Sequence, residues 1–567
     1  MKKILFVFLS LIFTLSAVGC DRGRLKLDET KTQLYIANYD GGVGTDWLYE
    51  AADRFAAEYA GEHFEEGKTG VEFVIEPQKS FKGNSAFDTI GSQPYDLFFA
   101  ETVYYNDLAL QGGLYDLTEI VREAIGGGET DTIESKIDEQ QQKFLTALTG
   151  GKYYALPHYE MYNGLMYDIE LFEKYGFYLA DASVPVEETQ DGFIANNQSL
   201  RRSPGPDGKT GVIDGVDYSL DDGLPSTYDE FYRLVEFMAK RGVYPMGWSG
   251  EYSWYSNYLL ESLYLNSTGA DEVMLNFDFD GGETDIITGF NGDTPIIERV
   301  AITEENGYLL KQQVGKYYAL KFLETLYRKE RPNESKYFSP GTFIETYTHT
   351  DMQEDFIKNY YDSKPIGMIS EGSYWYNEAK RAVSDVMAMY PDEAATHRYG
   401  FMPLPRYDGK EVKVTLSSQY NSYLFANATI ANDPNKVRLV KEFIKFLYRD
   451  SELQAFTVST GVAKGVQYEM PSSEISKMSL FAQQVWQLRE RADVVNPNND
   501  NSLFLNNQST ISLSQEVLWE SSVNRTPYSV PITAFRAGVS AKDYFLGMWM
   551  TESTWDSRYR QWFQTSD

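Results

Sequence analysis

The strongest constraint on the fold is an alternation of strand-like and helix-like segments near the start of the chain. Residues 33–37 and 71–76 have the pattern of strands, and residues 95–100 form an apolar strand-like run that ends at Glu101. Residues 46–60 carry apolar side chains on one face of a helix. Strands that alternate with helices favour a mostly parallel sheet covered on both faces. The sequence therefore predicts an α/β fold.

Length and later helix signals extend this prediction along the chain. A chain of 567 residues suits two to four domains of ordinary size. Thr227 and Glu230 have the spacing of a capping box at the start of a helix. Asp433 precedes Pro434, which suits the first position of a second helix. We expect amphipathic helices to follow both signals.

Two polar, glycine-containing stretches, residues 181–225 and 266–306, interrupt the pattern, and we expect both to be irregular insertions. The first contains Asp207, Asp214, Asp217, Asp221 and Asp222. Carboxylates among glycines can hold calcium through oxygen ligands, but no glutamate closes a twelve-residue calcium loop here. A solvated acidic loop is the favoured interpretation, and a calcium site is the weaker one.

The charge and the aromatic content limit the partners. Lys and Arg number 51 and Asp and Glu number 83, which gives a net charge of −32. Such a surface repels phosphate backbones, so nucleic acid is excluded as a partner. Aromatic residues make up 15% of the chain, a content that suits a site for flat, hydroxylated ligands.

The chain has one cysteine, so an internal disulfide and the usual cysteine zinc sites are excluded. A basic start and an apolar run over residues 4–18 precede Cys20. This segment resembles a bacterial lipoprotein signal with Cys20 as the lipidated residue, although Ala17 stands where that motif usually has Leu, Val or Ile. An ordinary secretory signal and an N-terminal membrane anchor are the alternatives. We expect a signal peptide over 1–20, a linker over 21–32, and a body outside the cytoplasm.

Motifs for catalysis are sparse. The four histidines are far apart, and neither H-E-x-x-H nor G-x-S-x-G occurs. Glu101, Glu160 and Glu371 lie beside aromatic residues, and a glycosidase needs two carboxylates roughly 5–10 Å apart. Hydrogen bonding to sugar hydroxyls is the simpler role. A lipid-anchored glycoside hydrolase is therefore kept as the enzymatic alternative, and the protein is predicted not to be an enzyme.

Five segments in order resemble family 1 of the extracellular solute-binding proteins of ABC importers, the carbohydrate-binding branch that includes maltose-binding protein. The first resembles the Y-A-L-P and G-L-x-Y-N-x-x-L-F-x-K-x-G signature, with Asp168 where Asn is common. The others are similar to the family's P-x-T-W-D-E-F helix start, its A-M-x-x-x-G-S-W strand and turn, its G-x-x-P-L-P strand and its F-I-K-F-L helix. The segments comprise residues 153–176, 224–231, 366–375, 399–405 and 442–451.

The resemblance implies a type II periplasmic-binding-protein-like fold, with two α/β lobes joined by a hinge and a ligand cleft between them. Lobe one is expected to hold residues 31–155 plus 411–470, and lobe two residues 156–410 plus 471–567. The implied function is that of a monomeric, lipid-anchored subunit without a cofactor. It would bind a carbohydrate, an oligosaccharide in particular, and deliver it to ABC permease subunits. A binding protein of the same fold for a non-sugar solute such as a peptide is the alternative.

The resemblance also implies which residues contact the ligand. Candidates that follow strands or turns are Tyr39, Asp40, Glu101, Tyr159, Glu160, Glu371, Tyr374 and Trp375. Candidates that follow the helix over 228–241 are Trp248, Tyr252, Trp254 and Tyr255. A pyranose packs its C–H face on an indole ring, so Trp375 and Trp248 are the first choices for stacking. Each of these side chains could belong to the core instead.

Overall fold

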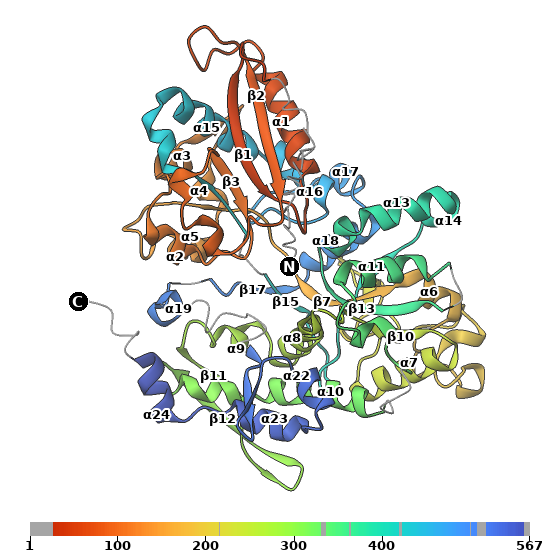
Figure 1. Ribbon diagram of the computed structural model, residues 1–567. Coiled ribbons are helices and arrows are strands. Elements are labelled where there is room, and N and C mark those ends of the chain that lie inside the picture. Colours follow the sequence, from red (N-terminus) through yellow and green to blue (C-terminus); the bar gives the residue numbers. More distant parts are fainter. Residues whose placement is uncertain are drawn as a thin grey trace, which may run out of the picture.

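Two β-sheets, one in each of two lobes, organise the molecule (Figure 1). The first sheet has the order β2-β1-β3-β16-β6 and the second β10-β13-β7-β14. The computed structural model describes residues 27–214, 216–329, 336–361, 364–418, 422–498, 500–506 and 518–560. The strands of the first sheet are β1 (Thr32–Tyr39), β2 (Val71–Gln78), β3 (Leu97–Ala100), β6 (Leu156–Pro157) and β16 (Tyr423–Ala426). Those of the second are β7 (Asn163–Asp168), β10 (Tyr244–Gly247), β13 (Ile366–Gly372) and β14 (Tyr399–Phe401).

The first sheet confirms the predicted strand–helix alternation. Strand β1 pairs in parallel with β2 and with β3, while β16 runs antiparallel to β3 and β6. Helix α1 (Asp46–Glu58) buries its apolar face, including Phe55. The ring of Phe55 packs edge-on against Phe443 and Phe446 of α15 (Pro434–Leu447), at centroid distances of 5.2 and 5.3 Å. Helices that are distant in sequence therefore share the core of lobe one.

Both predicted helix starts are present. Thr227 Oγ1 accepts a hydrogen bond from the Glu230 amide at 3.1 Å, and the Glu230 carboxylate accepts one from the Thr227 amide at 3.0 Å. This capping box opens α7 (Tyr228–Lys240), and Asp433 caps α15. The other main helices of lobe two are α6 (Ile169–Tyr175), α8 (Ser256–Thr268), α10 (Val314–Lys329), α11 (His349–Lys358), α13 (Lys380–Met389) and α18 (Leu480–Arg489).

The expectation of an irregular insertion over 266–306 is wrong. Most of this stretch is a long antiparallel hairpin of β11 (Asp280–Asn291) and β12 (Thr294–Thr303), and residues 266–268 end α8. Asn291 pairs with Thr294 across the turn, where Gly292 has a φ of +63°. An Asn-Gly pair supplies the left-handed backbone that a tight hairpin needs. By contrast, the helices and strands that the structure describes within residues 181–225 are short 3-10 turns and the small pair β8 (Val212–Ile213) and β9 (Val216–Asp217).

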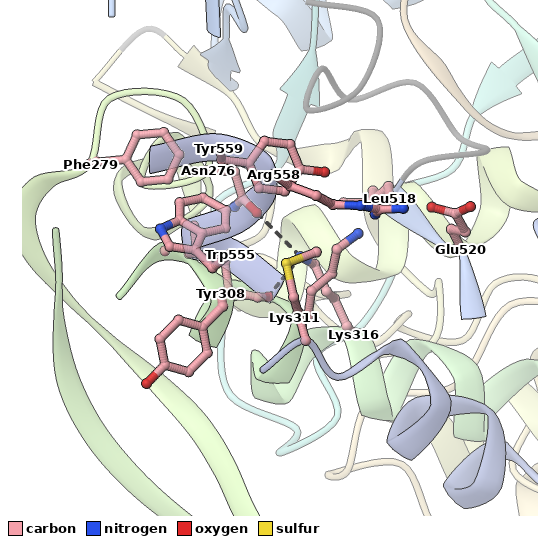
Figure 2. A pocket seen from close by; sticks show the side chains of 13 residues that line it. Asn276, Phe279, Tyr308, Lys311, Lys316, Leu518, Glu520, Trp555, Arg558 and Tyr559 are labelled. Atoms are coloured by element: carbon pink, nitrogen blue, oxygen red, sulfur yellow. Dashed lines mark hydrogen bonds between the residues drawn. The ribbon is translucent and has the colours of Figure 1, made fainter. Parts of the chain in front are cut away.

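The C-terminal region packs against lobe two. Its elements are β18 (Ser521–Val523), β19 (Thr526–Tyr528), α22 (Pro531–Arg536), α23 (Ala541–Met548) and α24 (Glu552–Trp555). Helices α22 and α23 contact α10, and α24 contacts the 3-10 helix η7 (Gly307–Gln312). The indole of Trp555 lies 5.9 Å from the Phe279 ring and 4.9 Å from the Tyr559 ring (Figure 2). Residues 552–560 thereby pack against the base of the hairpin.

The chain passes between the lobes more than once, and the passing segments are tied together. The Glu160 amide donates to the Ala463 carbonyl at 3.0 Å, and Tyr159 forms a bridge with Lys464. Nearby, β15 (Thr415–Ser417) pairs in parallel with β17 (Asp493–Val495). Several crossing strands thus share hydrogen bonds, which suits a hinge that bends without unravelling.

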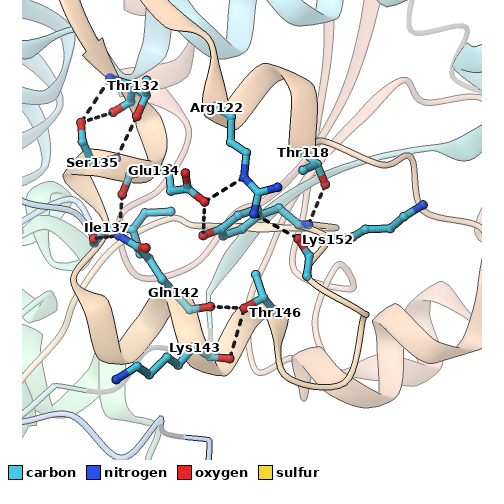
Figure 3. A network of polar contacts seen from close by, with 12 residues as sticks. Thr118, Arg122, Thr132, Glu134, Ser135, Ile137, Gln142, Lys143, Thr146 and Lys152 are labelled. Atoms are coloured by element: carbon cyan, nitrogen blue, oxygen red, sulfur yellow. Dashed lines mark hydrogen bonds and ion pairs between the residues drawn. The ribbon is translucent and has the colours of Figure 1, made fainter.

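A polar network in lobe one holds the segment that leads into β6 (Figure 3). Arg122 Nε donates to Glu134 Oε1 at 3.0 Å, and the Tyr153 hydroxyl donates to the same oxygen at 3.0 Å. The Tyr153 amide donates to Thr118 Oγ1 at 3.0 Å. The network fixes the backbone only a few residues before Tyr159, which lies where the lobes meet.

Among the described residues, no helix has the length and apolar character that a membrane span requires.

Candidate functional site

The candidate site lies where the carboxyl ends of β1 and β3 face lobe two. Tyr39 is the last residue of β1, and Glu101 directly follows β3. The Tyr39 hydroxyl lies within hydrogen-bonding reach of the Glu101 carboxyl group. Ligands of open α/β sheets bind at this edge, beyond the carboxyl ends of the strands. The fold thus brings the two predicted residues of lobe one together.

Gly42 lies at the centre of this meeting point. A Cβ atom on Gly42 would lie 3.2 Å from the Tyr159 hydroxyl, 3.5 Å from Glu101 Oε1 and 3.9 Å from the Tyr374 ring. The Gly42 carbonyl accepts a hydrogen bond from Asn377 Nδ2 of lobe two at 3.1 Å. Its φ of +54° also favours glycine. A residue without a side chain therefore lets the lobes approach here.

Lobe two contributes two carboxylates from β13 and α12 (Trp375–Glu378). Glu371 is 1% exposed and accepts hydrogen bonds from Gln353 Nε2 at 3.2 Å and from the Gly372 amide at 3.1 Å. Gln353 Nε2 also donates to Glu378 Oε2 at 3.0 Å, and His349 Nε2 lies 3.4 Å from Glu378 Oε1. One glutamine on α11 therefore bridges both carboxylates.

The pKa values of the three carboxyl groups shift in different directions because their surroundings differ. Burial raises the pKa of Glu101 to about 7, and the charge of Glu378 adds to the effect, against the Tyr39 hydrogen bond and Lys82. Burial and then Glu378 raise the pKa of Glu371 well above its ordinary value. Burial opposes ionisation of Glu378 as well, but the hydrogen bond and charge of His349 hold its pKa below the ordinary value. Of the three carboxyl groups, Glu378 is thus the one whose ionised form is favoured by its surroundings.

Aromatic rings form a wall beside these carboxylates. Trp254 stacks on Tyr255 with a centroid distance of 4.4 Å, and Tyr255 stacks on His349 at 5.7 Å. Tyr252 lies 6.1 Å from Trp254 and is 36% exposed. The Tyr255 hydroxyl lies within hydrogen-bonding reach of Tyr374. The wall carries flat rings next to hydrogen-bonding groups, which is the combination that a sugar ring needs.

Polar atoms at this meeting point lack partners among the described residues. The Tyr159 hydroxyl, His349 Nδ1 and Gln353 Oε1 are buried and make no hydrogen bond there. Buried polar atoms are normally paired, so such atoms favour a ligand that supplies hydroxyl or amide groups. A cavity of about 150 Å³ between the lobes lies beside Asn377 and Lys380 on one side and Thr460 and Gly461 on the other.

The structure does not support stacking roles for Trp375 and Trp248. Trp375 is fully buried and packs edge-on against Phe356, Tyr399 and Phe481 in the core of lobe two. Trp248 is 1% exposed and packs against Phe338. Both prove to be core residues, the alternative that the sequence left open. Turns set the direction of neighbouring side chains, so Tyr374 lies against Gly42 of lobe one while Trp375 points into the core of lobe two.

Glu160 and Asp40 also have other partners. Glu160 is 3% exposed, forms an ion pair with Arg489 at 3.1 Å, and accepts a hydrogen bond from the Tyr162 hydroxyl. It therefore helps to join the crossing segments to α18. Asp40 is exposed and accepts a hydrogen bond from Thr45 Oγ1 at 2.8 Å, just before α1.

The predicted contacts that the fold brings together are Tyr39, Glu101, Tyr159, Glu371, Tyr374, Trp254 and Tyr255, with Tyr252 at the edge.

Sequence reasoning missed Glu378, His349, Gln353 and Asn377. Glu378 follows Tyr374 by four residues, which is one helical turn. His349 and Gln353 have the same spacing on α11. Such polar pairs at helical spacing were the available signal, but nothing in the sequence shows that α11 reaches β13.

The aspartates of residues 207–222 serve local turns. Asp217 Oδ1 accepts from the Ser219 amide at 2.9 Å, and Asp221 Oδ2 accepts from the Asp207 amide at 3.0 Å. Burial and the neighbouring Asp207 charge raise the pKa of Asp221 to about 7. Within the ranges that the structure describes, no three His, Cys, Asp or Glu residues are placed to hold a metal ion. Asp214 and Asp222 add no such cluster.

Two lobes with polar and aromatic side chains facing each other define a binding protein whose ligand site lies between the lobes. Residues 44–453 match the family described as bacterial extracellular solute-binding proteins. Because the match spans most of the chain, this protein belongs to that family. No curated protein sequence matches the chain.

Solved structures show the same fold. A chitin oligosaccharide binding protein is 14% identical, with a TM-score of 0.50 over 93% of this chain and 98% of the other. The apo form of RafE from Streptococcus pneumoniae is 13% identical, with a TM-score of 0.51 over 94% and 99%. A structure from work on xylan utilization by Caldanaerobius polysaccharolyticus is 12% identical, with a TM-score of 0.52 over 91% and 99%.

The burial of Trp375 leads to a stability prediction. Trp375→Ala should lower the free energy of unfolding by about 3–5 kcal/mol, because it leaves a cavity in the core of lobe two. Trp254→Ala, at a half-buried position in the aromatic wall, should cost much less. Denaturant unfolding of both variants measures the difference. A Trp375→Ala protein as stable as the wild type would contradict the core assignment.

The raised pKa of Glu101 leads to a pH prediction. Its folded-state pKa of about 7 lies above the ordinary 4.5, so the protonated form stabilises the folded protein. This stabilisation is fully present below the ordinary pKa and is lost as pH rises through about 7. As pH rises from about 4.5 to about 7, Glu101→Gln should therefore gain stability relative to the wild type, and the difference should level off above about pH 7. Unfolding at several pH values tests this, with exposed Glu50→Gln as the control. A difference that does not change with pH would refute it.

Proposed function

We propose that this protein is the substrate-binding subunit of an ABC importer and that it binds a carbohydrate, an oligosaccharide in particular, between its lobes. The main support is the meeting of carboxylates and aromatic rings from both lobes around Gly42. Family membership supports the binding role, and a structural relative is named for binding chitin oligosaccharide. Closure of the lobes would bury the sugar and present one closed shape to the permease subunits.

Each side chain has a role in this proposal. Tyr39, Tyr159 and Tyr374 would exchange hydrogen bonds with sugar hydroxyls. Glu378 would accept hydrogen bonds as a carboxylate, while Glu101 could donate or accept one near neutral pH. Trp254 would carry the C–H face of a sugar ring.

Two other functions compete with this one. A non-sugar solute such as a peptide could occupy the same crevice. A glycoside hydrolase could use two of the carboxylates on opposite sides of a sugar. We favour binding without chemistry, without a cofactor and as a monomer, because the family is one of solute-binding proteins. Nucleic acid remains an unsuitable partner for a chain of net charge −32.

A binding screen tests the proposal. Chitin-derived, xylan-derived and α-glucan oligosaccharides are titrated by calorimetry, with peptides as the second panel and sugar hydrolysis monitored in parallel. One sugar class should bind, and Trp254→Ala should weaken it about thirtyfold through loss of a stacking contact. Trp549→Ala, at another half-buried tryptophan, is the matched control and should bind normally. Binding of peptides alone, or turnover of the sugar, would favour a competing function.

We further propose that Cys20 carries lipid and tethers the protein to the extracytoplasmic face of the cell membrane. Cys20 lies outside the described residues, so the support is the sequence pattern of residues 1–20. Cys20→Ala should move the protein from the membrane fraction to the soluble fraction. Fractionation and mass spectrometry of the N-terminus measure this. Unchanged membrane association together with an unchanged N-terminal mass would contradict lipidation.

A further inference from the structure

Two buried side chains, His158 and Lys464, join the crossing segments behind the candidate site. His158 directly follows β6 and is 3% exposed, and Lys464 is 1% exposed in the segment that follows α16 (Asp450–Thr460). His158 Nδ1 lies 2.8 Å from Lys464 Nζ. The backbones of the two segments are also in contact, because Tyr159 forms a bridge with Lys464. The pair is therefore a side-chain link across the hinge.

Aromatic rings surround the Lys464 side chain. The rings whose centroids lie 4.3 to 5.7 Å from Lys464 Nζ are those of Trp47, Phe99, Tyr448 and Phe456. Such rings accommodate an ammonium group through cation–π attraction, but they offer it no lone pair. Among the described residues, the one hydrogen bond of the Lys464 side chain is that to His158.

The pair also supports both sides of the contact at Gly42. The His158 ring packs edge-on against the Tyr159 ring at a centroid distance of 5.1 Å, and the Tyr159 hydroxyl lies beside Gly42. On the other side, the His158 ring lies 5.0 Å from the Trp47 ring. Trp47 Nε1 donates to the Gly44 carbonyl at 3.2 Å. A shift of the pair would therefore move both Tyr159 and the loop over residues 42–44.

The link requires that at least one of its two nitrogen atoms keeps a lone pair. This condition holds whether a proton lies on His158 or on Lys464, but it fails when both groups are protonated. Two like charges would then lie side by side in an apolar cage. Burial and then the charge of Lys464 lower the pKa of His158 well below its ordinary value of 6.5, and burial lowers the pKa of Lys464 as well. Acid therefore works against the link.

Other titratable groups near the pair are engaged elsewhere. The Tyr468 hydroxyl accepts a hydrogen bond from the Lys464 amide at 3.0 Å, and the Tyr448 hydroxyl donates to the Pro157 carbonyl at 2.7 Å. Glu160 forms its ion pair with Arg489. Helices α1 and α16 and strand β3 present Trp47, Phe456 and Phe99 to the pair.

We propose that His158 and Lys464 form a proton-sensitive clamp of the hinge, which positions Tyr159 and the loop over residues 42–44 until both groups are protonated. Both are positioning residues, because they act on a ligand through Tyr159 and the loop. The clamp itself does not depend on the solute, whereas its effect on sugar affinity rests on the proposed function. Since the folded-state pKa of His158 lies below 6.5, its contribution to stability is fully present above about pH 6.5 and is lost as pH falls below that value.

Hydrogen exchange in the ligand-free full chain tests the clamp. The Glu160 amide is the reporter, because it donates to the Ala463 carbonyl across the two segments. Its protection factor, which is corrected for the intrinsic effect of pH, should fall about tenfold between about pH 7 and about pH 5 in the wild type. Lys464→Met should lower it about tenfold already at about pH 7, because the hydrogen bond is lost.

His158→Asn separates the clamp from a merely structural role. The Oδ1 atom of asparagine accepts a hydrogen bond near the position of Nδ1 but does not titrate. This variant should keep the wild-type protection of Glu160 at about pH 7 and should lose the sensitivity to acid. The matched control is Lys445→Met, because Lys445 is a buried lysine of lobe one that pairs with Glu123 at 2.8 Å. Its Glu160 protection should follow the wild type at every pH.

Two results would overturn the proposal: wild-type protection of Glu160 that does not change with pH, or acid sensitivity that persists in His158→Asn. These results decide the proposal even if Lys464→Met does not fold. Titration with chitin-derived, xylan-derived and α-glucan oligosaccharides adds a second readout. Because Glu101, whose pKa is about 7, is present in both proteins, the ratio of wild-type to His158→Asn affinity at each pH isolates His158, and it should fall in acid. Absence of sugar binding by the wild type would count against the proposed function, while exchange at Glu160 would still decide the clamp.

Discussion

Burial of carboxyl groups between two lobes is the constraint on which the candidate site depends. Glu101 comes from lobe one, and Glu371 and Glu378 from lobe two. Burial favours the neutral form of each, so each needs a proton or a hydrogen-bond donor when the lobes come together. Gln353 and His349 supply donors on the lobe-two side. The raised pKa values of Glu101 and Glu371 are therefore a consequence of this burial and of the nearby Glu378 charge.

The approach of the lobes depends on backbone rather than on bulky side chains. Gly42 has no Cβ atom and can therefore lie close to Tyr159, Glu101 and Tyr374. Its carbonyl accepts a hydrogen bond from Asn377. Behind this contact, the crossing segments share backbone hydrogen bonds, and the Glu160–Arg489 ion pair joins them to α18. In a hinge of this kind, the hydrogen-bonded crossing segments form the axis about which the lobes rotate, and the contact at Gly42 is the part that separates.

Much of the fold followed from local patterns. The alternation of strands and helices predicted the parallel part of the first sheet, and the capping signals predicted the starts of α7 and α15. Part of the site followed as well, because residues after parallel strands share one edge of a sheet. Tyr39 and Glu101 meet for that reason. The hairpin over 280–303 was missed because its acidic composition and its Gly-Gly and Asn-Gly pairs were interpreted as signs of an irregular insertion, although Asn-Gly is also a hairpin turn signal.

The sequence by itself determined the α/β class, the helix caps, the acidic surface and the residues at the strand ends, because these depend on neighbours along the chain. Tertiary structure decided which of two adjacent aromatic residues, Tyr374 and Trp375, faces lobe one, since that depends on the direction of one turn. It also decided that Glu160 pairs with Arg489, 329 positions away, and that His158 meets Lys464, 306 positions away. Contacts between distant segments form only when packing brings whole elements together, and no local pattern records them.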